Sequence, residues 1–332
     1  MVLATLRTLH EEGRASQMKI LLVGGLGFIG KHLIRRIGEP HSLTVLSDAE
    51  AAWKNASFVK THGINLEIGD ITDEDRVRNV MLTHSPELVV HLAALTGIKR
   101  CNENPSLAFS VNVFGTYNIV MGCVKCKSKL IFISSREVYG ESVSDRTQEC
   151  DPLVPNNVYG VTKLLGEKLV TWAGSRYNLD YTILRLTNVY GPDGDQYNVQ
   201  AMIKKALTEG KIQILGGNQR MNFIYVEDVA EVVGRCFFDP RSSRQIFNVG
   251  AYDSISVEEV VSKLVSLLDV PPRIERLPMR DGETLNFRPS IEKLEKELDY
   301  RPTTTFTMGL RKTVEWYRDK MRPAADNLSS KE

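Results

Sequence analysis

The sequence predicts an α/β protein: a doubly wound parallel sheet with a smaller, interlocked C-terminal α/β lobe. Two observations carry this prediction. In the first half of the chain, short runs rich in Val, Ile and Leu alternate with segments of helix length, the pattern of strand–helix–strand crossovers that cover both faces of a sheet. The second half is less regular, and no long linker separates it from the first. We therefore expect the second lobe to pack directly on the sheet.

The elements of the first half are expected from local pattern. Residues 20–23 form a short apolar run that ends in Gly24, which is typical of a buried strand. A helix pattern follows, and similar apolar runs recur along the chain. We expect strands at 20–23, 43–46, 65–68, 88–92 and 130–133, helices at 28–37, 73–83 and 105–125, and a loop between the second and third strands.

The second half carries fewer regular patterns. Strands are expected at 181–185 and 245–249, and the apolar residues of 257–268 have the spacing of an amphipathic helix. Pro and Gly cluster at 271–289, which predicts loops. We expect 1–18 to be an N-terminal extension, 19–180 mainly the sheet domain, 181–321 mainly the second lobe with some segments returning to the sheet, and 322–332 a polar tail.

Composition argues against several classes of function. The 332 residues hold 42 Lys and Arg against 41 Asp and Glu, and a net charge of +1 gives no overall attraction to nucleic acid or anionic membrane. No apolar run is expected to reach the roughly 18 residues of a membrane span, and residues 1–17 lack the apolar core of a secretory signal. We therefore expect a cytoplasmic protein with neither a nucleic acid nor a membrane as partner.

The cysteines indicate neither a disulfide framework nor a metal site. Five are an odd and sparse set for disulfides. Cys123 and Cys126 have the spacing of half a metal site, but no second Cys pair or His cluster accompanies them. We expect both to be free thiols on a helix, and we expect no bound metal.

A glycine-rich turn directly follows the first strand and opens the first helix. Gly24, Gly27 and Gly30 form the pattern G-x-x-G-x-x-G. Without a Cβ, the backbone can turn tightly and approach a pyrophosphate, and the helix N-terminus offers N–H groups to the phosphates. In this strand–turn–helix context the pattern predicts a dinucleotide site, against the alternative of a purely structural turn.

An acidic residue near the end of the second strand is expected to bind the adenosine ribose of a dinucleotide. Asp48 lies 18 residues beyond Gly30 and favours NAD over NADP. Ser47, rather than an acid, ends the strand, so NADP is not excluded. A solvated loop aspartate is a nearly equal explanation of Asp48.

A second motif carries the chemistry. Ser135 follows the strand at 130–133, and Tyr159 and Lys163 are spaced so that on a helix both project from one face. A phenol with a pKa of about 10 acts as a base at neutral pH only where a nearby cation lowers that pKa. The Lys163 ammonium can do this for Tyr159, while the Ser135 hydroxyl binds the same substrate oxygen. Alone, Tyr159 and Lys163 would be explained as a surface pair.

These motifs occur in order with 91–94 (HLAA), 112–116 (NVFGT), 185–192 (RLTNVYGP) and 223–230 (FIYVEDVA). From about Lys19 to Lys320 the chain resembles the NAD-dependent nucleotide-sugar epimerase/dehydratase family of extended short-chain dehydrogenase/reductases, which includes UDP-glucose 4-epimerase-like proteins. The resemblance implies a Rossmann-type domain with tightly held NAD and a C-terminal lobe that binds a nucleotide-diphosphate sugar. It also implies a homodimer, commonly formed through a four-helix bundle.

By position, the resemblance makes Ser135 the catalytic hydroxyl, Tyr159 the acid/base and Lys163 its tuner and a ribose ligand. Asn112 falls where the family has a structural Asn near the active-site lysine. The residues expected to bind the cofactor are Gly24, Gly27, Phe28, Ile29, Gly30, Asp48, Asp70, Ile71, Leu92, Ala93, Ala94, Asn112, Tyr159 and Lys163. Those expected to bind the substrate are Ser135, Asn188, Arg220 and Arg280.

The chain departs from the family pattern at the substrate site. Where the family has Arg-Asp before the FIYV run, this chain has Met221 and Asn222, so a diphosphate-binding Arg is missing. Arg220 is adjacent, but strand alternation points it to the other face unless the loop is displaced.

The next two residues, Arg136 and Glu137, also bear on which reaction is expected. Dehydratases of the family resemble Thr-Asp-Glu at 135–137; here Arg136 replaces the Asp and Glu137 is kept. Glu137 is therefore a candidate extra catalytic base, and local pairing with Arg136 or another cation is an equal alternative.

The sequence therefore predicts an NAD-dependent nucleotide-sugar epimerase, acting at C4 through a transient keto sugar. One alternative is a 4,6-dehydratase or decarboxylase that uses Glu137. The others are an NADP-linked sugar reductase and a non-catalytic nucleotide-binding regulatory subunit.

Overall fold

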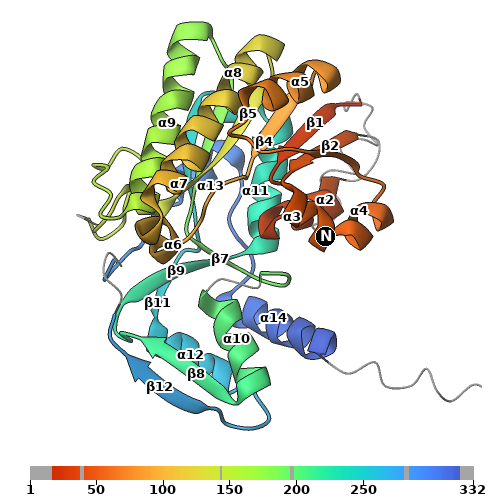
Figure 1. The fold of residues 1–332 in the computed structure, drawn as a ribbon. Helices are drawn as coiled ribbons and strands as arrows, with labels where there is room; N and C mark the ends of the chain where they lie inside the picture. Colours follow the sequence, from red (N-terminus) through yellow and green to blue (C-terminus); the bar gives the residue numbers. More distant parts are fainter. Residues whose placement is uncertain (1–16, 38–40, 143, 195–197, 280–283, 322–332) are drawn as a thin grey trace, which may run out of the picture.

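A seven-stranded parallel sheet forms the centre of the larger lobe, in the order β10-β6-β5-β4-β1-β2-β3 (Figure 1). The computed structural model describes residues 17–37, 41–142, 144–194, 198–279 and 284–321. The predicted doubly wound α/β fold is confirmed. Residues 1–16, the predicted polar tail 322–332 and Arg280 lie outside the described residues.

The strands and helices alternate as crossovers require. The strands are β1 (Lys19–Val23), β2 (Ser42–Ser47), β3 (Asn65–Ile68), β4 (Leu88–His91), β5 (Lys129–Ser135), β6 (Tyr181–Leu186), β7 (Asn188–Tyr190), β8 (Lys211–Leu215), β9 (Arg220–Tyr225), β10 (Gln245–Val249), β11 (Ser254–Ser256) and β12 (Arg273–Leu277). The α-helices are α2 (Phe28–Ile37), α3 (Ala49–Lys54), α4 (Ala56–Thr61), α5 (Glu74–His84), α6 (Ile98–Glu103), α7 (Pro105–Phe109), α8 (Thr116–Cys126), α9 (Val158–Tyr177), α10 (Asn198–Glu209), α11 (Val226–Phe238), α12 (Val257–Val265), α13 (Glu292–Leu298) and α14 (Phe306–Met321). A π-helical turn spans Ser110–Gly115, and 3-10 turns span Arg136–Val138 and Pro240–Ser242.

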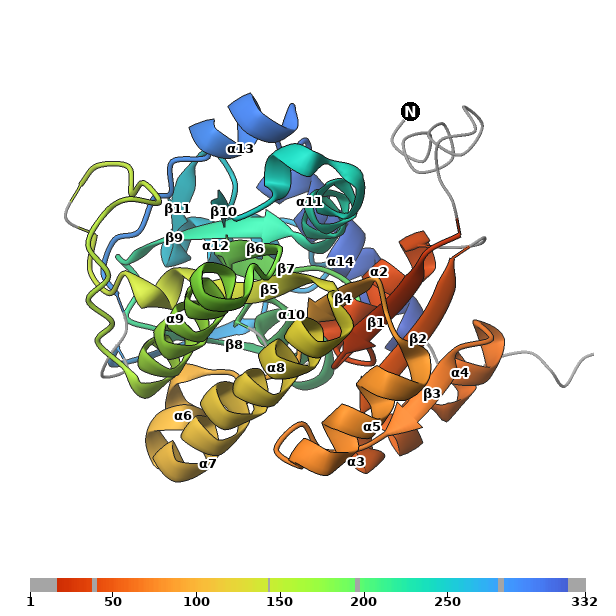
Figure 2. The same ribbon diagram turned by 90° about the horizontal axis from the view of Figure 1, so that it is seen from above.

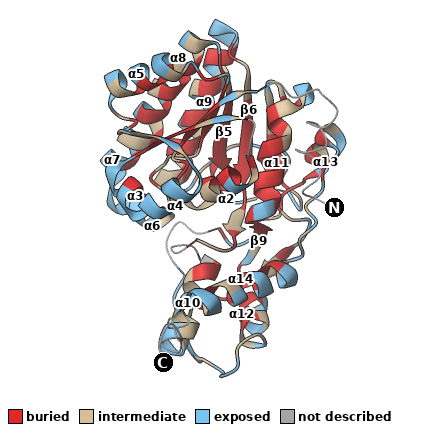
Figure 3. Ribbon diagram, turned by 90° about the vertical axis from the view of Figure 1, so that its right-hand side faces the viewer, coloured by how far each residue is buried: buried red, intermediate tan, exposed pale blue. Residues whose placement is uncertain are grey.

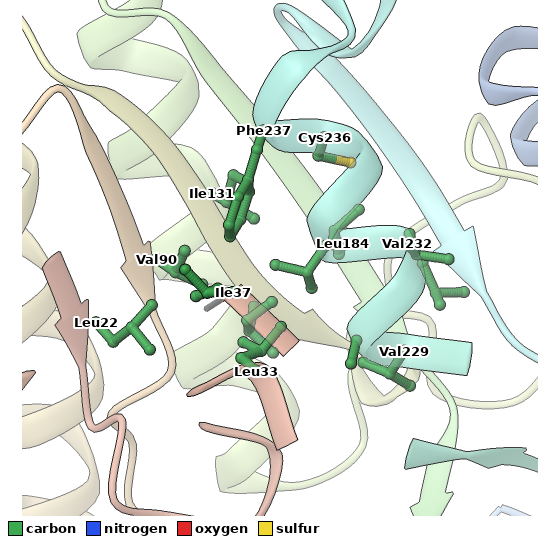
Figure 4. Packing of buried hydrophobic residues seen from close by; sticks show 14 of the residues in the cluster. Leu22, Leu33, Ile37, Val90, Ile131, Leu184, Val229, Val232, Cys236 and Phe237 are labelled. Carbon is green, nitrogen blue, oxygen red and sulfur yellow. The ribbon is translucent and has the colours of Figure 1, made fainter. Parts of the chain in front are cut away.

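The sheet strands are apolar throughout because both faces are covered. In β1, Leu22 packs into the cluster beneath α2 and α11, while Leu21 packs into the cluster beneath α5, α8 and α9. Figure 4 shows the first cluster, with Leu33 and Ile37 of α2 and Phe237 of α11 meeting the strands. Figure 3 shows the buried strands between partly exposed helices.

The parallel strands place the predicted motifs on one edge. Gly24, Asp48, Asp70, Leu92 and the end of β5 each lie at the carboxyl end of a strand. The chain reverses its direction of progress across the sheet between β1 and β4, which is the position where open α/β sheets bind ligands.

The second lobe lies below the carboxyl edge of the sheet in Figure 1. It has a three-stranded sheet, β11-β9-β7, and a two-stranded sheet, β12-β8. Its core gathers apolar side chains of α10, α12 and α14, among them Ile203, Leu264 and Leu310. Strands β6 and β10, from the second half of the chain, pair within the large sheet, and Figure 2 shows β6 next to β5 with β10 beyond it.

Several elements differ from the sequence expectations. The segment expected as a loop after β2 contains α3 and α4, because the Asp48 carboxylate accepts the Ala51 N–H and starts a helix. The expected helix 105–125 is interrupted by the π-helical turn around Asn112. The loops expected at 271–289 include β12, which forms by pairing with β8. Helix α12 ends at Val265, before Leu268.

One segment also corrects the expectation about apolar runs. Residues Pro105–Cys126 are long and apolar enough to cross a membrane by length and composition. In the structure, Ile119, Val120 and Cys123 of this segment are fully buried against the sheet. One face of this segment therefore packs on the sheet of the large lobe.

Candidate active site

The glycine turn is a close backbone cradle. Gly24 has φ +78°, and a Cβ there would lie 2.7 Å from the Ala93 backbone. A Cβ on Gly30 would collide with the Gly25 carbonyl. The Gly27 N–H donates to the Gly24 carbonyl at 3.1 Å, and α2 begins at Phe28. The residues present therefore fit a dinucleotide pyrophosphate, which needs open backbone at a helix N-terminus.

The segment after β4 forms the opposite wall of this cradle. The N–H groups of Leu92 and Ala93 both donate to the Val23 carbonyl, at 2.8 and 2.9 Å. Leu92, Ala93 and Ala94 are half-buried. This contact joins the ends of β1 and β4 at the point where the strand order reverses.

The predicted adenosine ligands lie at the ends of β2 and β3. Asp48 is exposed, and one of its oxygens caps α3 at 2.8 Å from the Ala51 nitrogen. Oδ1 of Asp70 accepts the N–H of Thr72 at 2.8 Å and its hydroxyl at 2.9 Å. Ile71 is buried against Gly115. Their contacts with a cofactor stay predictions.

Local packing brings the Ser135 and Tyr159 segments together. Ser135 is buried at the end of β5, and its Oγ accepts the Glu137 N–H at 3.2 Å. The Asn157 side chain caps α9 by accepting the Gly160 N–H at 2.9 Å. A side chain on Gly160 would collide with the Glu137 carbonyl. The first turn of α9, which carries the half-buried Tyr159, therefore packs directly on the turn that follows Ser135.

Lys163 is buried one turn further along α9. Its Nζ donates to the Ile133 carbonyl at 2.6 Å and lies 4.9 Å from the centroid of the Phe132 ring. Burial lowers the pKa of Lys163 to about 8. The ammonium is thus fixed under the end of β5, two residues before Ser135.

Asn112 holds the segments around this lysine. Its Oδ1 accepts the Leu95 N–H at 2.7 Å, and its Nδ2 donates to the Leu95 carbonyl at 3.0 Å and to the Thr162 hydroxyl at 2.9 Å. These bonds join the π-helical turn to the segment after β4 and to α9, next to Lys163. Asn112 thus lies beside Lys163, and its contact with a cofactor stays a prediction.

Both carboxylate oxygens of Glu137 have partners. Oε1 forms an ion pair with Nη2 of Arg136 at 2.7 Å, and Oε2 accepts from Nδ2 of Asn157 at 2.9 Å. Both side chains of the pair are buried. Of the two explanations of Glu137, this geometry favours local pairing with Arg136 over an extra catalytic base.

The predicted substrate ligands do not all converge. Asn188 donates to the Asn222 carbonyl at 2.9 Å. Arg220 is exposed, with Nη2 donating to the Ser254 carbonyl at 2.5 Å and Nη1 3.5 Å from Glu259. Met221, in contrast, lines a cavity of the second lobe together with Val199, Met202, Leu215, Gln219, Phe223, Val257 and Val260. Arg220 is thus held by groups of β11 and α12, and its contact with a substrate stays a prediction.

A buried polar network behind Ser135 was not predicted. Arg185 forms hydrogen bonds with both oxygens of Glu167, and Ser134 donates to the same carboxylate at 2.5 Å. Arg185 also donates to the Tyr139 hydroxyl, which donates to Asn248 at 2.7 Å. The network ties β5, β6, β10 and α9 together. The sequence carried one sign of this network: Arg185 is a charged residue in the otherwise apolar strand 181–185. A buried charge needs a partner, so a buried acidic residue could have been expected beside it.

The described part of the chain offers no group of three or more His, Cys, Asp or Glu side chains that could hold a metal ion. All five cysteines are free thiols. Cys123 and Cys126 lie on α8 as expected, and burial raises the pKa of both thiols.

The parallel sheet, the glycine cradle and the ordered set of Ser135, Tyr159 and Lys163 define an enzyme with a dinucleotide cofactor. The chain belongs to the NAD dependent epimerase/dehydratase family, whose sequence model matches residues 20–250. NAD is the cofactor, and the family acts on nucleotide sugars as epimerases, dehydratases and decarboxylases.

Relatives with different reactions are about equally similar. The chain is 28% identical over 318 residues to the UDP-N-acetyl-alpha-D-glucosaminuronate decarboxylase of Bacillus cytotoxicus (91% of this chain, 98% of the relative). It is 28% identical over 313 residues to the UDP-glucose 4-epimerase of Mycolicibacterium smegmatis (91% and 99%). The UDP-glucuronic acid 4-epimerase of Bacillus cereus, solved with UDP-glucuronic acid and NAD, matches with a TM-score of 0.85 at 25% identity (91% and 100%).

Proposed function

We propose that this protein is a nucleotide-sugar epimerase that inverts C4 of the sugar through a transient keto sugar. The observation that supports the proposal is that both carboxylate oxygens of Glu137 already have partners, Arg136 and Asn157. A dehydratase or decarboxylase of the kind considered above would need this carboxylate for a second proton transfer. The set of Ser135, Tyr159 and Lys163 is sufficient for oxidation and reduction at one carbon.

In this mechanism Tyr159 takes the proton of the sugar 4-hydroxyl and later returns it. The Ser135 hydroxyl forms a hydrogen bond with the same sugar oxygen and orients it. The buried Lys163 ammonium stabilises the phenolate of Tyr159, because a neighbouring positive charge favours the anionic form. The Ile133 carbonyl fixes this ammonium in place.

The cradle of Gly24, Gly27 and Gly30 would hold the pyrophosphate of NAD, with Ala93 forming the opposite wall. When bound, NAD accepts a hydride from the sugar carbon and returns it, so no net cofactor is consumed. The chain's own contribution is to orient the sugar and to place the proton carrier.

The proposal is tested by incubating the purified protein with a panel of nucleotide sugars, without added cofactor. Exchange between C4 stereoisomers is expected, and loss of water or CO2 would replace the proposal with the dehydratase or decarboxylase. In parallel, Glu137→Gln should keep the hydrogen bond to Asn157 and retain at least about a tenth of the kcat, since no proton passes through Glu137. A loss of 10²-fold or more in kcat, with the protein still folded, would assign Glu137 to the chemistry.

A further inference from the structure

Arg136 is a buried cation, and not all of the N–H donors of its guanidinium have acceptors among the described residues. It follows Ser135 directly, and its side chain is 7% exposed. One terminal nitrogen pairs with Glu137 at 2.7 Å, and the guanidinium carbon lies 5.3 Å from the centroid of the Phe287 ring. Its Nε is buried and has no hydrogen-bond partner among the residues the structure describes. A guanidinium carries five N–H donors, and a buried donor without an acceptor is costly.

The charges around Ser135 also leave room for an anion. The turn after β5 carries the buried Arg136 and Glu137, and Nζ of Lys163, on α9, reaches the Ile133 carbonyl of β5. The next buried carboxylate on α9, Glu167, is already paired with Arg185. In the proposed mechanism Lys163 faces the Tyr159 phenolate, and Glu137 occupies only one terminal nitrogen of Arg136. The guanidinium of Arg136 therefore keeps donors for a further anion.

We propose that Arg136 binds a carboxylate on the substrate sugar, so that the preferred substrates are nucleotide-linked uronic acids. The planar guanidinium suits a carboxylate, which accepts two parallel N–H bonds. Phe287 on one face and Glu137 at one end fix the orientation of the guanidinium before the substrate binds. This inference rests on the proposed function, because it names the class of sugar that the same site takes.

Two sugars that differ only at C6 test the inference: UDP-glucose, with a hydroxymethyl group, and UDP-glucuronic acid, with a carboxylate. Their dissociation constants are measured by calorimetry on the purified, NAD-saturated protein. The wild type should bind the uronate roughly 10- to 100-fold more tightly, the range of a hydrogen bond to a charged group. Arg136→Met should weaken uronate binding by that factor and change the binding of UDP-glucose by less than about threefold.

Two further variants separate recognition from folding. Arg136→Lys keeps the positive charge and should retain part of the uronate preference, even if Arg136→Met does not fold. Arg241→Met is the matched control, because Arg241 lies in the turn after α11, is half-exposed and is paired with Asp239 and Asp299; it should leave both constants unchanged.

The remaining outcomes separate a failure of this inference from a failure of the proposed function. Equal binding of both sugars by the wild type, or an equal loss for both in Arg136→Met, would make Arg136 a structural partner of Glu137 and leave the proposed function intact. Binding of neither sugar by the wild type would overturn the proposed function and this inference together.

Discussion

The side chain of His91 is buried at the end of β4 with one ring nitrogen satisfied. The Thr116 hydroxyl donates to the Asn112 carbonyl at 2.6 Å, so its oxygen accepts from Nε2 of His91 at 3.0 Å. Nδ1 is buried and has no partner among the described residues. Protonating Nδ1 would bury an unpaired charge, and burial together with Lys163 lowers the pKa of His91 to about 3.

This histidine should make the protein sensitive to acid. Between about pH 6.5, where an unfolded histidine titrates, and pH 3, the unfolded chain binds a proton that the folded chain does not. The free energy of unfolding should therefore fall with decreasing pH, by about 1.4 kcal/mol per pH unit from His91 alone. Urea unfolding of wild type and His91→Gln from pH 6 to pH 4 measures this term as the difference between the two slopes. His62→Gln, at an exposed position, should keep the wild-type slope; identical slopes for His91→Gln would refute the assignment.

At the residue scale, the positions of Gly24, Ser135, Tyr159 and Lys163 in the fold could be predicted, because each belongs to a motif that also specifies its local backbone; their roles stay predictions. The sequence could not decide whether Glu137 is an extra catalytic base or a local ion-pair partner. Whether that carboxylate is free depends on Asn157, twenty residues later, and on how Phe287 orients Arg136. Arg220 was undecided for a similar reason: its direction is set by Ser254 and Glu259, which arrive with another strand and helix.

At the scale of elements, the buried strands of the large sheet could be predicted because both of their faces are apolar. The elements that escaped prediction depend on single contacts. Helix α3 begins with the Asp48 cap, and the π-helical turn contains Asn112, whose side chain is bound to Leu95. Strand β12 is mostly exposed and is held by pairing with β8. Such contacts leave almost no periodic signal in the sequence.

We propose that helices α8 and α9 form the interface of the expected homodimer. They pack side by side on the outer surface (Figure 2). Large apolar side chains are exposed on both helices and on the π-helical turn before α8, namely Phe114, Tyr117, Leu165 and Trp172. Pairing these helices with a second copy would bury this surface and complete a four-helix bundle.

Light scattering tests the dimer. The wild type should have twice the chain mass of 37.3 kDa, and Trp172→Glu should shift the protein toward monomer, because it buries a charge in the interface. Trp53→Glu changes an 80% exposed tryptophan on α3 and should leave the dimer intact. A monomeric wild type would exclude the proposal.

At the scale of the whole molecule, two lobes meet at the carboxyl edge of one parallel sheet. The net charge of +1 gives no indication of an anionic substrate, because the groups proposed to bind it act locally. Positive charge is concentrated at that edge by the backbone N–H groups of the glycine cradle, by Lys163 and by Arg136. Met221, in contrast, lines an apolar cavity of the second lobe. The site is thus specified by a few placed groups at the junction of the lobes.

The central claim is that C4 of the sugar is oxidised and reduced again within one site. The most direct test uses UDP-glucose and UDP-glucuronic acid labelled with deuterium at C4, incubated in ordinary water without added cofactor and followed by NMR. The expected product is the C4 epimer with the deuterium still at C4. Deuterium lost to the solvent or moved to C6, or a product that has lost water or CO2, would contradict it.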